Sequence, residues 1–221
     1  MKGMPPQRWD FSHALAQGFV SLLGRAPAPE ELQAFSRYLA LLLQWNRAQR
    51  LTGYRSAQEI TSKLFLDSLR FLRWIEPGDE KVLDLGAGPG IPGVPLKIVE
   101  PRIHLTLLEA RRRRVSFLAT VVRELGFTDV RLLHGRAEVL SESEPGLRAA
   151  FDVVVTRGAG PLRSIVPMAL AFLRPGGRFI GSGPPIGNPT PSLHLQAPHR
   201  WESFPTLGGI GGRRFLIAEK T

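Results

Sequence analysis

Apolar positions in the first 76 residues recur at helical spacing, which predicts an all-helical segment. Three stretches carry the pattern, over about residues 11–23, 30–50 and 57–74. Pro29 and the two glutamates after it suit a first helical turn, and Ser56 suits the N-cap of a new helix. We therefore predict an N-terminal helical cap over residues 1–76.

Beyond residue 77 the pattern changes to short apolar runs that alternate with helical ones. Helical spacing recurs from about Pro92, over residues 112–125 and over residues 162–173. Seven runs have the β-rich character of strands: KVLDL, HLTLLE, VRLLHG, FDVVVT, RFIGS, WESF and RRFLIAE. This alternation indicates βαβ units on a mostly parallel sheet that the last two runs close as a hairpin. An α/β domain is thus predicted over residues 77–221, with the proline-rich residues 181–200 as an extended loop.

The sequence VLDLGAGPGIPGVPL places a glycine-rich turn directly after the first predicted strand. Ligands of open α/β sheets bind beyond the carboxyl ends of the strands, where glycines let a nucleotide approach the backbone. Gly86, Gly88 and Gly90 lie at this turn, and Pro92 suits the first position of the helix that follows. Gly88, Gly90 and Gly93 also satisfy the dinucleotide pattern G-x-G-x-x-G, which alone is weakly specific.

Two carboxylates favour S-adenosylmethionine (SAM) over a dinucleotide at this turn. Asp84 lies two residues before Gly86, where it would repel a pyrophosphate but could engage the ammonium group of a methionine moiety, directly or through water. Glu109 ends the next strand and suits ribose hydroxyls in either case. The hypothesis is a SAM site, with an NAD(P)-dependent oxidoreductase as the rival.

The net charge, the absence of cysteine and the length of the apolar runs indicate what kind of partner and environment the chain has. The chain of 221 residues has 29 lysines and arginines against 19 aspartates and glutamates, a formal charge of +10, which favours a polyanion such as nucleic acid. It has no cysteine, which excludes disulfides and thiolate chemistry. The chain shows no apolar run of signal-peptide or membrane-span length, so we expect a soluble, cytoplasmic protein without membrane contact.

Several longer motifs resemble the RsmG (GidB) family of bacterial ribosomal RNA methyltransferases. They are WNRAQRLTGYRSAQEITSKLFLDSL, VLDLGAGPGIPGVPLKIVEP, LTLLEARRRRVSFLATVVRELG, HGRAEVL and FDVVVTRG, in the family's order and spacing. The resemblance implies a class I SAM-dependent methyltransferase, with a Rossmann-like, mostly parallel seven-stranded sheet and an N-terminal helical cap. It also implies methylation of N7 of one guanine in 16S ribosomal RNA.

The resemblance assigns roles to individual residues. It places Gly86, Gly88 and Gly90 at the methionine end of SAM beside Asp84, and Glu109 at the ribose. It also implies adenine contacts from Ala137 and Glu138, and an arginine, Arg157, at the mouth shared by cofactor and substrate. Guanine N7 has a lone pair and no proton, so no catalytic base is expected; positioning is the main task, with Arg157 the candidate. Asn46, Thr52 and Asp67 match family positions in the cap, but each could equally satisfy helix ends and turns.

Arginines beside the expected cofactor mouth are candidates for RNA binding. A run of four at the start of a helix lies where the helix dipole disfavours cations, which fits contact with phosphates as well as a solvated face. We name as RNA-binding candidates Arg111, Arg112, Arg113, Arg114, Arg50 and Lys63. The expected partner is 16S rRNA or the small ribosomal subunit, and the expected state is a monomer. No histidines have metal-ligand spacing, and we expect no metal.

Four departures from the family pattern lie outside the cofactor turn. Arg50 replaces the usual Asn and Leu64 the usual His, TRGAGPL replaces S/T-R-A-x-A, and RFIGSGPPIG lacks the family's Lys-Gly pair. We therefore expect SAM binding to be retained, while these departures bear on rate, target choice or activity itself. A non-catalytic RNA-binding or ribosome-assembly factor and a small-molecule methyltransferase remain alternatives.

Overall fold

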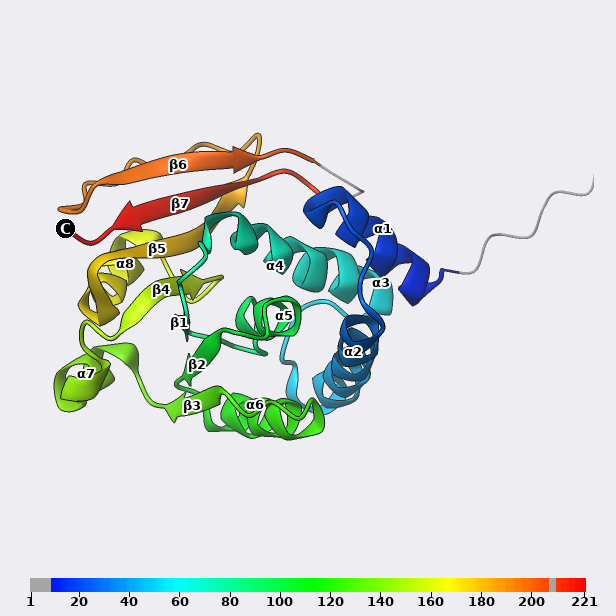
Figure 1. Ribbon diagram of the computed structural model, residues 1–221. Helices are drawn as coiled ribbons and strands as arrows, with labels where there is room; N and C mark the ends of the chain where they lie inside the picture. Colours follow the sequence, from blue (N-terminus) through cyan, green and yellow to red (C-terminus); the bar gives the residue numbers. More distant parts are fainter. Residues whose placement is uncertain (1–8, 207–209) are drawn as a thin grey trace, which may run out of the picture.

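A seven-stranded sheet forms the centre of the computed structural model, which describes residues 9–206 and 210–221. The strand order is β3-β2-β1-β4-β5-β7-β6, parallel from β3 to β5, while β7 runs antiparallel to both of its neighbours (Figure 1). The strands are β1 (Lys81–Leu85), β2 (His104–Glu109), β3 (Val130–His134), β4 (Phe151–Thr156), β5 (Leu173–Pro185), β6 (His199–Phe204) and β7 (Arg213–Glu219). The predicted mostly parallel sheet with a closing hairpin is confirmed.

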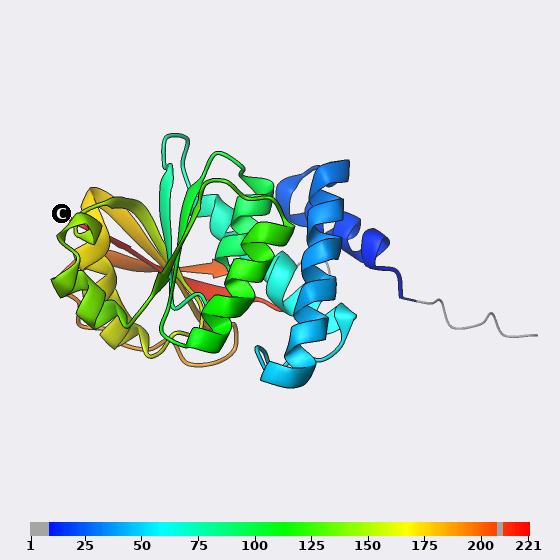
Figure 2. The same ribbon diagram turned by 90° about the horizontal axis from the view of Figure 1, so that it is seen from below.

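Helices cover both faces of the sheet (Figures 1 and 2). One face packs against α5 (Gly93–Val99), α6 (Arg112–Glu124) and the N-terminal helices, and the other against α7 (Ala137–Ser143), the 3-10 turn η3 (Pro145–Leu147) and α8 (Leu162–Phe172). Side chains alternate between the two faces as the strand pleat requires: Val82 belongs to the first core and Leu83 to the second. β1, β2 and β4 are buried on both faces and read as nearly continuous apolar runs, whereas the edge strand β3 is only partly buried.

The N-terminal segment is helical, as its periodicity predicts. It contains α1 (Phe11–Leu23), α2 (Pro29–Gln49) and a composite third rod of α3 (Ala57–Ile60), η1 (Thr61–Leu66), α4 (Asp67–Leu69) and η2 (Arg70–Trp74). The prediction of one regular helix over 57–74 is wrong in detail, because η1 is a π-helix and η2 a 3-10 helix. The hydroxyls of Thr61, Ser62 and Ser68 donate to carbonyls four residues back and compete with the regular backbone ladder.

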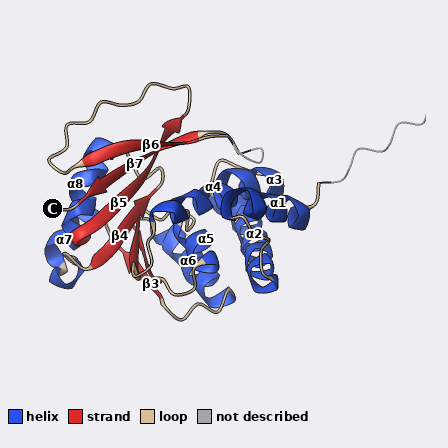
Figure 3. Cartoon of the chain, turned by 45° about the horizontal axis from the view of Figure 1, so that its top comes forward, coloured by secondary structure: helices blue, strands red, loops and turns tan. Residues whose placement is uncertain are grey.

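Three further details differ from the sequence prediction. Pro92 is the N-cap of α5 rather than its first residue, and α7 is a helix that the sequence pattern did not predict. Residues 181–200 are not all loop: β5 continues to Pro185 and β6 begins at His199, which leaves a long loop over 186–198 (Figure 3). β5 gains these residues because its end pairs with β7, Ser182 opposite Phe215 and Pro185 opposite Arg213.

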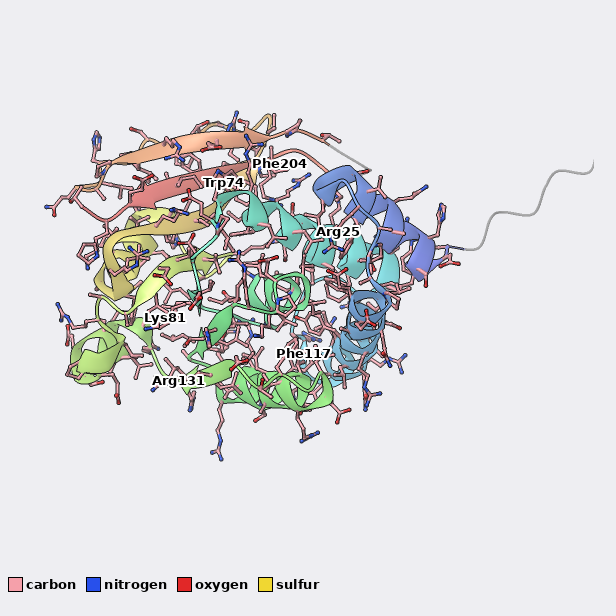
Figure 4. The ribbon with its side chains drawn as sticks, viewed as in Figure 1. Arg25, Trp74, Lys81, Phe117, Arg131 and Phe204 are labelled. Carbon is pink, nitrogen blue, oxygen red and sulfur yellow. The ribbon has the colours of Figure 1, made fainter. Side chains whose placement is uncertain are left out.

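The helical cap and the sheet share one hydrophobic core. Tyr38 of α2 stacks on Phe65 with ring centroids 4.9 Å apart, and Phe117 of α6 lies between this pair and Trp45. Phe117, labelled in Figure 4, is fully buried where α6 meets the cap. Trp74, at the end of the cap, packs on the β7 ring of Phe215 at 4.9 Å. The cap is therefore held to the sheet by aromatic contacts, and a boundary at residue 76 stays a prediction.

Candidate active site at the carboxyl ends of the strands

A cleft of about 710 Å³ lies where β1, β2 and β4 end. This is the edge where the order of the parallel strands reverses between β1 and β4, the usual ligand crevice of such sheets. Six of the predicted cofactor residues line it: Gly86, Gly88, Glu109, Ala137, Glu138 and Arg157. Two others, Asp84 and Gly90, do not line it: Asp84 is buried beneath the glycine-rich loop, and Gly90 belongs to the loop but faces Val94 and Tyr38.

The loop after β1 turns tightly because of its glycines. Gly86 and Gly88 have φ of 74° and 58°, in the left-handed region that disfavours other residues. The amides of Gly86 and Ala87 both donate to the Leu108 carbonyl at 2.9 Å, which ties the loop to β2. Tyr38 of the cap donates from its hydroxyl to the Pro89 carbonyl at 2.5 Å. The cap thus helps to fix the conformation of the glycine-rich loop.

Asp84 is fully buried beneath this loop. Its Oδ2 accepts a hydrogen bond of 2.8 Å from the Gly93 amide, while Oδ1 is buried without a hydrogen-bond partner among the described residues. Burial raises the pKa of Asp84 from 3.8 to about 7, against the lowering effect of the Gly93 amide and with a smaller contribution from Glu109. The carboxyl therefore supports the start of α5, and its predicted contact with a cofactor ammonium stays a prediction.

Glu109 forms the floor of the cleft. It is 4% exposed, and its two oxygens accept from the amides of Gly88 at 2.9 Å and Arg111 at 2.8 Å. The Nη1 of Arg114 lies 3.6 Å from Oε2. Because each carboxylate oxygen can accept more than one hydrogen bond, ribose hydroxyls can still be bound here. Glu109 also connects the glycine-rich loop to the start of α6.

Arg157, at the other side of the cleft, belongs to a cluster around Asp67. Asp67 is buried, with Oδ1 accepting from Arg70 at 3.0 Å and Oδ2 lying 3.1 Å from both Arg157 Nη1 and Arg213 Nε. The two 3.1 Å contacts are charge contacts without hydrogen-bond geometry. Desolvation lowers the pKa values of Arg70 and Arg157, partly offset by the charge of Asp67. One carboxylate thus orients three guanidinium groups from the cap, the end of β4 and β7.

The loop between α2 and α3 supplies the cap side of the cleft. The Asn46 amide group donates to the Tyr54 carbonyl at 2.8 Å, and its oxygen accepts from the Thr52 amide at 2.9 Å. Thr52 and Tyr54 both line the cleft. Asn46 therefore closes a turn, as the sequence allowed, and that turn forms part of the site.

The arginine candidates separate into two groups. Arg111 and Arg114 line the cleft, whereas Arg112 and Arg113 are on α6 outside it. Arg50 lines an adjoining cavity, and Lys63 is exposed outside both cavities.

Sequence reasoning did not find Tyr38 or Arg213 as contributors to the site. Tyr38 is 51 positions from Pro89 in the chain, and Arg213 is on the last strand. Both meet the site only through the tertiary fold, and a single sequence carries no local signal for either.

A cavity of about 430 Å³ lies at the amino ends of β1 and β2, the edge opposite the glycine-rich loop. In the part of the chain that the structure describes, no three His, Cys, Asp or Glu side chains gather for a metal ion. Among the same residues, no helix is long and apolar enough to cross a membrane.

Comparisons with known sequences decide the family. The model of the GidB family, described as rRNA small subunit methyltransferase G, matches residues 31–181. The chain belongs to this family. It is 41% identical over 167 residues to the "Ribosomal RNA small subunit methyltransferase G" of Caldanaerobacter subterraneus, over 75% of this chain and 69% of that protein. It is 38% identical over 150 residues to the protein of the same name from Thermoanaerobacter sp., over 67% of this chain and 62% of that protein.

The chain therefore spans about two thirds of the length of these rRNA small subunit methyltransferase G relatives. Solved structures agree with the fold. A point mutant of MtNAS in complex with S-adenosylmethionine superposes with a TM-score of 0.56 at 19% identity, over 83% of this chain and 75% of that one. TrmN from Thermus thermophilus superposes with a TM-score of 0.53 at 20% identity, over 71% of this chain and 48% of that one. The predicted family and the class I methyltransferase fold are confirmed, and with them SAM as the cofactor of the family.

Proposed function

We propose that this chain methylates N7 of a specific guanine in 16S ribosomal RNA, free or within the small ribosomal subunit, as a cytoplasmic monomer. The observation that carries the proposal is the cleft itself. In a chain of the rRNA small subunit methyltransferase G family, it gathers a glycine-rich loop, a buried carboxylate and arginines at the switch point of the sheet. The formal charge of +10 supports a polyanionic substrate.

The residues of the cleft fit SAM. Gly88, in the left-handed region, leaves room beside the backbone for the methionine end, whereas the space beside Gly86 is filled by Ala159. Glu109 can accept from ribose hydroxyls. Ala137 and Glu138, in the first turn of α7, would contact the adenine edge. When bound there, the cofactor supplies an electrophilic methyl group on its sulfonium.

The chain contributes orientation to the reaction. Guanine N7 is a nucleophile without a proton, so no side chain has to remove one. Holding N7 in line with the methyl group can contribute on the order of 7 to 11 kcal/mol to rate acceleration. Arg157, fixed by Asp67 at the cleft wall, would donate to guanine O6. Arginine often binds O6 and N7 together, but here N7 must remain free to react.

The test is transfer of labelled methyl from SAM to 16S rRNA and to small subunits that lack the modification. The site is then mapped by cleavage chemistry specific for N7-methylguanine. We expect a single labelled guanine, and no label when that guanine is replaced by 7-deazaguanine, which has carbon at position 7. SAM binding without transfer to either substrate would contradict the proposal and favour the non-catalytic RNA-binding alternative.

A further inference from the structure

A second cavity of about 690 Å³ adjoins the cofactor cleft on the side of the cap. Its wall contains four arginines: Arg47 from α2, Arg50 and Arg55 from the loop after α2, and Arg114 from α6. We call it the arginine cavity. Leu51, Thr52 and Arg114 line both the arginine cavity and the cleft, so the two spaces share a wall. A polymer that places one unit in the cleft would have its neighbouring unit at the arginine cavity.

The charge in the arginine cavity is uncompensated. None of its lining residues is acidic. Within residues 9–206 and 210–221, Arg47, Arg50 and Arg55 form no ion pair, and Arg114 has only the 3.6 Å contact with Glu109. The other charged side chains of the cap include closely paired examples, such as Arg25 with Glu31 at 2.6 Å. Four guanidinium groups around one space repel one another, and an anion placed between them would relieve that repulsion.

The backbone at Arg50 adds an independent observation. Arg50 ends α2 with φ 48° and ψ 55°, a left-handed conformation that glycine and asparagine adopt most easily. Only one other residue besides glycine, Ala149, has a positive φ in the described chain. An arginine here is locally disfavoured, and its side chain lines the arginine cavity. Strained conformations of this kind concentrate at functional sites.

We propose that the arginine cavity binds a backbone phosphate of the RNA segment that carries the target guanine. The proposal rests on the function proposed above and adds to it a specific phosphate site beside the cofactor cleft. Guanidinium groups match the phosphodiester because each offers a planar fork of donors to its oxygens. Such a contact fixes the register of the RNA without reading its sequence. Arg114 would then contact the RNA on one side and Glu109 on the other.

The test compares the double variant Arg50→Gln/Arg55→Gln with Arg131→Gln. Arg131 is an exposed arginine on β3, on the far side of α6 from the cap in Figure 4, and it serves as the control for loss of positive charge. We expect weaker binding of 16S rRNA by the double variant and a shallower dependence of log K on log salt. The slope should fall by roughly 0.7 to 0.9 for each phosphate that is no longer neutralised. SAM affinity should stay at the wild-type value.

A second measurement locates the phosphate. RNA fragments around the mapped guanine carry a single neutral methylphosphonate at each neighbouring position in turn. We expect one position at which wild type loses affinity and the double variant loses none further, the signature of two groups that act on each other. A double variant whose salt slope changes, for each charge removed, by no more than that of Arg131→Gln, or that loses affinity at every position as wild type does, would overturn the proposal.

Two controls separate the possible failures. If wild type neither binds nor methylates 16S rRNA, the proposed function and this site fail together; if it methylates RNA while the variants behave alike, only this site fails. Inorganic phosphate alone is the second probe. Saturable phosphate binding lost in the double variant, without any change in its RNA affinity, would assign the cavity to a free anion and also overturn the proposal.

Discussion

Replacing Asp84 by asparagine should stabilise the protein at alkaline pH and leave it little changed at acidic pH. The pKa of the buried carboxyl is raised from 3.8 to about 7. Because a tenfold change in proton affinity equals about 1.4 kcal/mol, ionised Asp84 costs the folded state about 4 kcal/mol. The folded state binds the proton of Asp84 more tightly than the unfolded chain does. The wild-type protein therefore has its full stability below pH 4 and loses about this amount as pH rises towards 7. Asparagine has no charge to bury, and its oxygen can still accept from the Gly93 amide.

Urea unfolding of wild type and Asp84→Asn at pH 5.5 and pH 8 measures the difference. We expect the free energy of unfolding of the variant to exceed that of wild type by about 2 to 4 kcal/mol at pH 8, and the gap to shrink at pH 5.5. Equal pH dependence in the two proteins would refute the reasoning. Calorimetric titration with SAM at pH 8 tests the separate cofactor role: a more stable variant that binds SAM over tenfold more weakly would indicate contact with the ammonium group.

Three further substitutions test the other parts of the site. Glu109→Ala should weaken SAM binding by roughly 1 to 3 kcal/mol in calorimetry, with exposed Glu144→Ala as control; unchanged affinity would remove Glu109 from the ribose site. Tyr38→Phe should lower SAM affinity by about 1 kcal/mol, because the Pro89 carbonyl loses its donor while the ring stacking remains. Equal affinity would show that the glycine-rich loop keeps its conformation without this hydrogen bond. Asp67→Ala should lower the free energy of unfolding, measured by urea denaturation, by about 3 to 5 kcal/mol, because three guanidinium groups lose their shared anion. Asp129, which is half-exposed, provides the control. If Asp67→Ala loses no more stability than Asp129→Ala, the expectation is contradicted.

The elements of the sheet could be predicted because each strand carries its own signal. Runs such as FDVVVT are apolar on both faces, and the glycine-rich turn after β1 marks the ligand edge. The π-helix within residues 57–74 could not be predicted, because hydroxyls that bond back to carbonyls look the same in sequence as hydroxyls that face solvent. The helix α7 was missed because it is only seven residues long and carries one buried residue, Ala137.

The site was predictable where its residues follow strand ends. Glu109, Ala137 and Arg157 come at or soon after the ends of β2, β3 and β4, and parallel strands bring such positions to one edge. Burial is a property of the whole fold, which is why Asp84 was expected in the cleft and is found beneath the loop. The segment RFIGSGPPIG, which lacks the family's lysine, illustrates the same limit. Arg213 of β7 donates to the carbonyl of Gly183 within β5 at 3.1 Å, so another strand brings a cation to this segment.

The place of β7 in the sheet bears on how a newly made chain matures. β7 follows β6 in sequence, yet it lies between β5 and β6, so among the described strands β6 has no neighbour until residues 213–219 have been synthesised. The same strand brings Arg213 to Asp67 and Phe215 to Trp74. A ribosome-bound chain that still lacks this segment can form the cap helices and the first parallel strands, but cannot complete the cluster that fixes Arg157. Maturation of the cleft is thus deferred until β7 is inserted.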